Sequence, residues 1–179
     1  SMFRPIFDEV LTKLKSKEEL LPAANGGHID SGHAYLARGG DLVDLLSSDQ
    51  LATLFGDNGK WLDTNITRDR TPGLRTYLMN ELGVPEIDPE RFARQLRRGF
   101  LASQDDSWII EFYQYLSDKP ALLRKSKSQT DWRGRTIVTR EPGILFSVPI
   151  IRLSDDSHVA PFRSDGEPTA YLPGKFSSS

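Results

Sequence analysis

Residues 144–159 read ILFSVPIIRLSDDSHV, and they mark a change in the character of the chain. Branched and aromatic apolar residues dominate residues 144–153, which is typical of extended strands. The polar run at residues 154–157 predicts a turn, after which His158 and Val159 return as a partner strand. The stretch therefore predicts a β-hairpin near the C-terminal end.

Upstream of residue 125, apolar residues mostly recur every three or four positions, as on amphipathic helices. Start signals are present, among them the capping box of residues 47–50 and the proline at position 72, directly after a threonine. Asp88-Pro89 is a second helix-start signal of this kind, with a capping residue followed by proline. Helices are predicted over residues 4–16, from the Gly39-Gly40 pair to 46, and over 48–55, 72–82, 89–101 and 105–116, with a helical turn at 120–124.

A second hairpin is predicted near the N-terminal end, because Asn25-Gly26 is a strong turn signal and lies between two short extended runs. The two predicted hairpins share a plan: an apolar strand, a polar turn, and then a histidine followed by a β-branched residue. Convergence is the simpler explanation, because hairpins are common. Duplication of an ancestral segment is the alternative.

These elements predict an α+β fold that is mostly helical, with amphipathic helices and two short β-hairpins, one near each end. Residues 1–124 form the helical region with its N-terminal hairpin. Residues 125–135 are polar and basic and are predicted to be a mobile loop. Residues 136–179 comprise the second hairpin and an irregular tail, packed on the helices as one domain.

Composition limits the function. The 179 residues carry a net charge of −2 and a pI near 5.9, which disfavours a general nucleic-acid binder, although a local basic patch remains compatible. The absence of cysteine excludes disulfides, thiolate metal sites and cysteine nucleophiles, and it fits a cytoplasmic location. No apolar run reaches the roughly 18 residues that span a bilayer, so no membrane partner is expected.

The sequence offers no motif for catalysis, cofactor binding or metal binding. His28, His33 and His158 lack the spacing of a rigid zinc site. The carboxylate pairs at 105–106 and 155–156 fall at a helix start and a turn, where capping explains them. Neither a P-loop nor a GxSxG elbow is present. We therefore expect that this chain is not an enzyme and binds no cofactor, and a hydrolase with an unrecognised site is the weaker alternative.

One basic cluster suggests nucleic acid. Three arginines share a face of the predicted 89–101 helix, and three further cations follow after residue 123. Clustered cations of this kind release counterions from phosphates. A solvated helix face paired with Glu90 explains the same residues, and Trp61 and Trp108 are better explained as core. The predicted contact residues are Arg91, Arg94, Arg98, Arg124, Lys125 and Lys127.

Two stretches resemble large bacterial sacsin-like proteins: residues 149–173, from Pro149 to Pro173, and residues 61–78, from Trp61 to Leu78. The resemblance implies a region that follows an ATP-binding domain of the gyrase, chaperone and histidine-kinase type. None of the ATP-site motifs of that domain matches this chain, so no catalytic residue is carried over. A full-length protein would hydrolyse ATP through a domain outside this chain.

Ser1 before Met2 suggests a segment taken from a longer protein, and a complete small protein is the alternative. We expect a non-catalytic structural or interaction module within a larger ATP-dependent sacsin-like protein. Its partners would be other domains of the same chain or another protein, with nucleic acid as the alternative. The predicted interdomain contacts are the apolar residues at both ends: Phe3, Ile6, Phe7, Phe162, Tyr171, Leu172 and Phe176.

Overall fold

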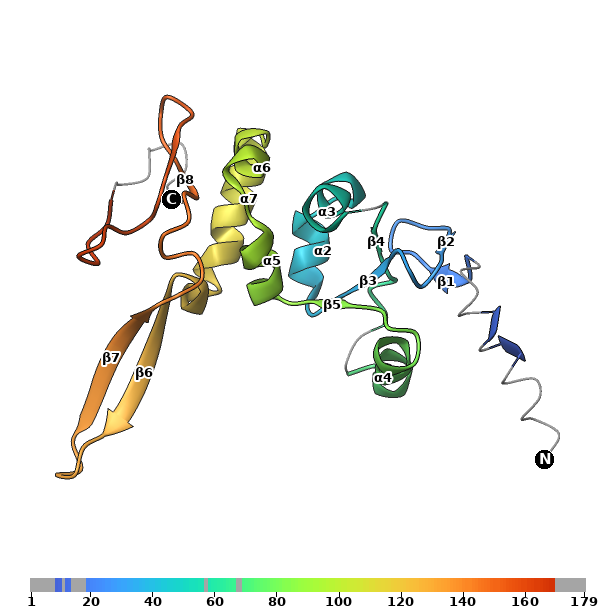
Figure 1. Cartoon of the computed structure of the whole chain (residues 1–179), viewed down its shortest axis with the longest axis horizontal. Helices are drawn as coiled ribbons and strands as arrows, with labels where there is room; N and C mark the ends of the chain where they lie inside the picture. The colour runs from blue at the N-terminus through green and yellow to red at the C-terminus, as the bar shows by residue number, and fades with distance from the viewer. Residues whose placement is uncertain (1–8, 11, 14–18, 57, 67–68, 170–179) are drawn as a thin grey trace. The chain divides into compact units, whose positions relative to one another are not determined.

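The computed structural model describes residues 9–10, 12–13, 19–56, 58–66 and 69–169. The chain divides into two compact units, Ser1–Asp88 (unit 1) and Pro89–Ser179 (unit 2), and each is described by itself (Figure 1). Helices take up 36% of the described residues and strands 22%. The α+β prediction is therefore confirmed, while "mostly helical" overstates the helix content. Within the predicted 4–16 helix, residues 9–10 and 12–13 are helical and the rest lies outside the described residues.

From residue 19 onward, the described part of unit 1 combines an antiparallel hairpin, a small parallel sheet and three helices. Strand β3 is the central strand of the sheet, and it pairs in parallel with β4 on one side and β5 on the other. The strands are too short to show an alternating pattern, and the sheet was missed for that reason. The elements are β1 (Leu21–Pro22), β2 (His28–Ile29), β3 (Ala34–Ala37), α2 (Gly40–Leu45), α3 (Ser48–Phe55), β4 (Lys60–Trp61), α4 (Pro72–Asn80) and β5 (Glu86–Ile87).

The capping box predicted at the start of α3 is confirmed, whereas Thr71 makes no side-chain capping bond at the start of α4. Ser47 accepts a hydrogen bond from the Gln50 N–H, and the Gln50 side chain accepts one from the Ser47 N–H, which completes the capping box of α3. The indole N–H of Trp61 donates to the carbonyl of Leu46 at 2.9 Å, so this buried tryptophan belongs to the core, as expected. The unit 1 core cluster contains Leu21, Ala23, Ile29, Ala34, Leu36, Leu62, Ile66, Leu78 and Val84.

A buried arginine links α4 to the parallel sheet. The guanidinium of Arg75 donates to the carbonyl of Ile66 at 3.0 Å and to that of Ala37, at the end of β3, at 2.9 Å. It also pairs with the Glu86 carboxylate on β5. One side chain thereby joins a helix, a loop and two strands.

Unit 2 is built on three helices and two antiparallel hairpins. The predicted 89–101 helix is wrong as a single element, because it divides into two helices at Arg97. Arg97 has an extended backbone, and its guanidinium donates to the carbonyls of Arg94 and Leu96, which ends the first helix. The elements are α5 (Pro89–Gln95), α6 (Arg98–Ala102), α7 (Asp106–Ser117), the 3₁₀ turn η1 (Pro120–Leu122), β6 (Arg124–Thr130), β7 (Thr136–Pro142), β8 (Ile151–Arg152) and β9 (His158–Val159).

Aromatic side chains fill the space between these helices. Asp105 caps α7 by accepting from the Trp108 N–H at 2.8 Å, as the sequence predicted. Trp108 then stacks on Phe112 with ring centroids 5.2 Å apart, and Phe100 on α6 meets Trp108 edge to face. Phe92 on α5 meets Phe112 edge to face. The three helices therefore share one aromatic core.

A second buried arginine fastens the β8–β9 hairpin to the helices. Arg152 donates to the carbonyls of Leu101 at 3.0 Å and Gln104 at 2.7 Å, and it pairs with Asp106 at 3.1 Å. The Tyr113 hydroxyl accepts from the Arg152 N–H at 2.8 Å. The hairpin thus depends on groups supplied by α6, α7 and the loop between them.

Two further expectations for unit 2 are wrong. Residues 125–135 are not a loop, because residues 124–130 pair with residues 136–142 over seven positions. Residues 144–150 are not a strand: they form turns, in which the N–H of Leu145 donates to Leu122 and the N–H of Phe146 to Gly143. Apolar character alone misled the prediction here, since a buried turn is as apolar as a buried strand.

The same five-residue loop closes four antiparallel pairs. In each loop, the N–H of the first residue donates to the carbonyl of the fifth residue, and the N–H of the fourth residue donates to the carbonyl of the first. The fourth residue has a positive φ, which favours glycine, and this is a type I turn with a G1 bulge. The fourth residues are Gly26 (φ 84°), Gly134 (φ 75°), Asp156 (φ 61°) and Gly166 (φ 83°).

The two predicted hairpins also share their register, Pro22 opposite His28 and Arg152 opposite His158. A common loop type is a sufficient physical reason for this likeness. Duplication stays a hypothesis.

Replacing Arg75 by Met should destabilise unit 1 by about 3 kcal/mol, because breaking a buried charged pair costs about 3–5 kcal/mol. The loss of stability is measured by native-state hydrogen exchange of the Leu36 and Arg38 amides, which form hydrogen bonds within the sheet. The matched control is Arg38→Met, where a half-exposed arginine loses its pairs with Glu86 and Asp88. That change should cost no more than about 1 kcal/mol. Equal effects of the two changes would contradict the role given to Arg75.

His158 makes the stability of unit 2 sensitive to acid. It is buried opposite Arg152, and burial together with the positive charges of Arg152 and Arg98 lowers its pKa from the ordinary 6.5. The unfolded chain then takes up a proton first as the pH falls, so stability is full above pH 6.5 and declines below it.

We expect the free energy of unfolding of unit 2 to fall between pH 7 and pH 5, and expect His158→Gln to flatten that fall. The free energy of unfolding at each pH is measured by hydrogen exchange of the Ile109 amide in α7, corrected for intrinsic exchange rates. Parallel pH profiles for the two proteins would remove His158 as the cause.

Candidate functional site

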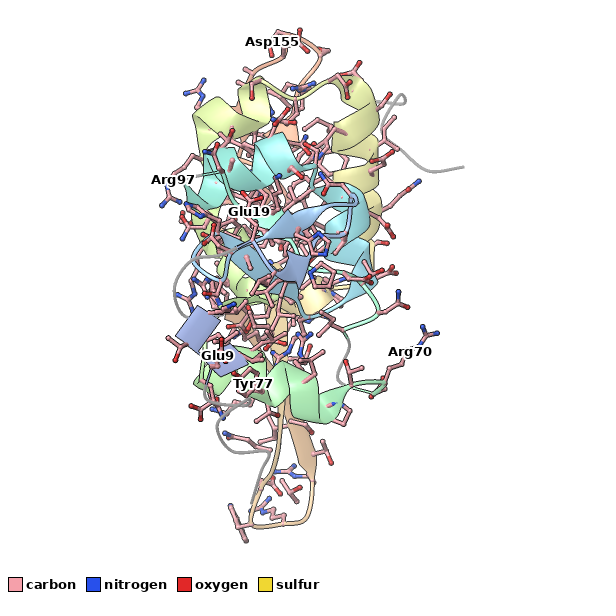
Figure 2. The ribbon with its side chains drawn as sticks, turned by 90° about the vertical axis from the view of Figure 1, so that its right-hand side faces the viewer. Glu9, Glu19, Arg70, Tyr77, Arg97 and Asp155 are labelled. Carbon is pink, nitrogen blue, oxygen red and sulfur yellow. The ribbon has the colours of Figure 1, made fainter. Side chains whose placement is uncertain are left out.

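The β6–β7 hairpin, residues 124–142, is called the arm below. It extends away from the helices of unit 2, toward the end opposite the β8–β9 turn where Asp155 lies (Figures 1 and 2). From residue 125 to residue 142 every side chain except that of Asp131 is exposed. Both faces of the ribbon are therefore open within unit 2.

The base of the arm is held by aromatic and backbone contacts. The Arg124 guanidinium lies 4.1 Å from the ring centroid of Phe162 and 5.7 Å from that of Phe146, and the two rings stack on one another. The N–H of Gly143 donates to Leu123 at 2.9 Å. These contacts join the arm to η1 and to the chain that follows β7.

A network around Asp131 fixes the tip. Its carboxylate accepts from the N–H groups of Arg133 and Arg135, at 2.9 and 2.8 Å, and from the Arg135 guanidinium at 2.9 Å. The hydrogen bond from the Arg135 N–H is the largest influence lowering the pKa of Asp131. Trp132 stands beside this network, 85% exposed, with the Arg133 guanidinium 4.3 Å from its ring. The tip is thus an ordered turn that presents a tryptophan.

The arm concentrates positive charge. Residues 124–142 contain six lysines and arginines against two carboxylates, a net charge of +4, so the remainder of the chain sums to −6. Lys127 pairs with Glu141 at 3.6 Å and Lys125 with Glu90 at 3.2 Å. Such exposed pairs are worth about 0–1 kcal/mol. An external anion can therefore replace these carboxylates at little cost.

The predicted basic residues do not all come together. Arg91 and Arg94 lie on α5 while Arg98 begins α6, so the prediction that the three share one helix face is wrong. Arg94 pairs with Glu90 at 3.9 Å, as the alternative explanation expected. Arg97, between the two helices, is exposed and is labelled in Figure 2.

The other three predicted cations belong to the arm. Arg124 lies at its base, and Lys125 and Lys127 lie on one face of β6. Sequence reasoning missed Trp132 and Arg140, which the arm adds to this set. The missed signal was Gly134, which lies between the polar run at residues 124–130 and the β-branched run at residues 136–139.

Most of the predicted interdomain residues lie outside the part of the chain that the structure describes. Phe162 is half-buried in the stack at the base of the arm. Phe3, Ile6, Phe7, Tyr171, Leu172 and Phe176 lie outside the described residues. Their role in interdomain contact stays a prediction.

A second candidate lies in unit 1, at a cavity of about 410 Å³ lined by Asp30, His33, His28 and Lys60 among others. His33 Nδ1 lies 2.7 Å from the Asp30 carboxylate. Burial raises the pKa of Asp30, but the hydrogen bonds from His33 and from the Gly32 N–H outweigh it, and the net pKa is lowered. Across the described ranges no three histidines or carboxylates are grouped to hold a metal ion. The Asp30–His33 pair serves to order the turn after β2.

Comparisons with family models, curated proteins and solved structures find no match for this chain. Among the residues that the structure describes, no helix is both long and apolar enough to cross a membrane. Within the described residues, the arm is an ordered element that packs into neither hydrophobic core.

Gly143→Ala should loosen the base of the arm, because a Cβ there would lie 2.3 Å from the Leu122 carbonyl oxygen. We expect a loss of about 1–3 kcal/mol in unit 2 stability, read from exchange of the Leu145 amide, which bonds to Leu122. Gly99→Ala is the control: it lies in α6 with open space around it and should be neutral or stabilising by up to about 1 kcal/mol. Similar losses in both variants would argue against a tight base.

Proposed function

We propose that this chain is a non-catalytic structural and interaction module within a larger ATP-dependent sacsin-like protein, and that the arm is its contact surface. The observation that carries the proposal is the exposure of a seven-pair ribbon on both of its faces. The resemblance of residues 61–78 and 149–173 to sacsin-like proteins supplies the larger context.

The arm is costly to maintain unless something covers it. Two-stranded hairpins are marginally stable in water without packing on a third element. This arm also exposes apolar side chains along β7 and at its tip, with Ile137 at 50%, Val138 at 61% and Trp132 at 85% exposure. A partner that packs on the ribbon would bury these groups and pair its open strand edges.

Three sets of charged groups in the chain support a structural role. Arg75 holds a helix to a sheet, and Arg152 holds a hairpin to two helices. The Asp30–His33 pair orders a turn. Each of these groups has a structural partner that accounts for it, and we therefore favour binding over catalysis, with a hydrolase as the weaker alternative.

Site-specific photo-crosslinking in the full-length protein tests the contact surface. A benzophenone amino acid at Val138, in the middle of β7, should give one discrete adduct with another domain or a partner molecule. The matched control is Leu74 on α4, which is similarly apolar and 46% exposed. If Val138 gives no more adduct than Leu74, the arm is not a contact surface.

Titration calorimetry of this chain with ATP and Mg²⁺ should show no binding heat, because a nucleotide site needs a backbone cradle for its phosphates. The control is the full-length protein, which should bind ATP if it carries the proposed ATP-binding domain. Micromolar binding of ATP by this chain alone would contradict the non-catalytic role.

A further inference from the structure

We propose that the arm binds double-stranded DNA, with the ribbon lying along a groove and Trp132 at its tip contacting the bases. This inference rests on the proposed function, since it takes the arm as the contact surface and names its partner. It differs from the basic-helix hypothesis in placing the contact on β6, β7 and the turn between them.

The first support is the separation of charge. The arm carries +4 while the rest of the chain sums to −6. A polyanion would be repelled by the acidic remainder and attracted to the arm, which orients the encounter. The ion pairs of Lys125 and Lys127 are exposed, so phosphates can take the place of Glu90 and Glu141.

The second support is the shape of the arm. A two-stranded β-ribbon is one of the elements that the major groove of B-DNA admits. Side chains two residues apart on a strand are about 6.8 Å apart, and one DNA strand presents a charge about every 3.4 Å along the axis. Lys125 and Lys127 are therefore far enough apart to meet two different phosphates of one strand.

The cations lie on both faces of the ribbon. Lys125 and Lys127 share one face, while Arg140, which pairs with Ser126, lies on the opposite face. A ribbon that enters a groove on one of its edges has a phosphate backbone beside each face, so cations on both faces can meet phosphates. An acidic protein surface would cover one face and leave the other cation in water, which is why we favour DNA over an acidic protein.

The tip supplies the third support. Trp132 is 85% exposed, yet its loop is ordered by the hydrogen bonds to Asp131 and the positive φ of Gly134. Flat apolar side chains held at the end of a protein element insert between base steps or stack on bases. The neighbouring Arg133 guanidinium adds a cation that is close to the same bases.

Fluorescence anisotropy of the whole chain with a labelled 20-base-pair duplex at 50 mM salt tests this partner. Neutralising Lys125, Lys127 and Arg140 to Gln should weaken binding at least about tenfold and reduce the slope of log K against log salt by about 2–3, since each phosphate contact contributes about 0.9. The matched control neutralises Arg94 and Arg98 on α5 and α6, and should change affinity less than about threefold if those residues make no phosphate contact.

The tip is tested separately. Trp132→Ala should weaken duplex binding several-fold without changing the salt slope, because a stacking contact is not electrostatic. Tryptophan fluorescence of the parent protein should be quenched by the duplex, and Trp132→Phe should remove that quenching while Trp61 and Trp108 remain. Unchanged quenching in Trp132→Phe would overturn the tip contact.

Three outcomes overturn the DNA proposal: no duplex binding at 50 mM salt, full loss of binding in the Arg94/Arg98 control, or tighter binding of polyglutamate than of the duplex. The last would identify an acidic protein as the partner. Folding of each variant is checked by the exchange of the Ile109 amide in α7. If crosslinking from Val138 still gives a protein adduct while duplex binding fails, the DNA inference fails and the arm remains a contact surface. If both fail, the proposed function fails as well.

Discussion

A buried arginine that donates to main-chain carbonyls holds each unit together. The strands outside the arm are two to four residues long, and such short strands offer few ladder bonds to fix their positions. Arg75 in unit 1 and Arg152 in unit 2 supply this connection by bonding to carbonyls at the ends of neighbouring elements. Guanidinium suits the task, because its several N–H groups point in fixed directions in one plane. The positions of the sheet and of the β8–β9 hairpin both depend on these contacts.

A buried arginine also affects the groups around it, because its positive charge has little water to screen it. In unit 2 the positive charge of Arg152 stands opposite His158, and burial together with the charges of Arg152 and Arg98 lowers the pKa of that histidine. The indole of Trp108 and the ring of Phe112 are buried in the helical core of the same unit, where an added charge would lack water. Charge is tolerated in these interiors because the guanidinium groups meet carbonyl oxygens and carboxylates.

The arm, in contrast, is not held by buried side chains along its length. Its strands are the longest of the described residues, yet nearly all of their side chains face solvent. Backbone pairing, the Asp131 network and the stack of Arg124 on Phe162 keep the ribbon formed without a hydrophobic core of its own. An element that is ordered but uncovered has its surface available for a partner. The concentration of positive charge on it gives that partner a chemical character.

The sequence by itself determined the local elements whose signals lie within a few residues: the capping box at Ser47, the Asp105 cap, the helices that follow them, and the turn closed by Gly26. It also determined that the chain carries a basic segment after residue 123. Only the tertiary structure decided that α5 and α6 separate at Arg97, that β3 lies between β4 and β5, and that the basic segment is a ribbon. These outcomes depend on contacts between distant residues, such as Arg75 with Ala37 or Lys127 with Glu141, and no local pattern encodes which distant partner will satisfy a charge or a carbonyl.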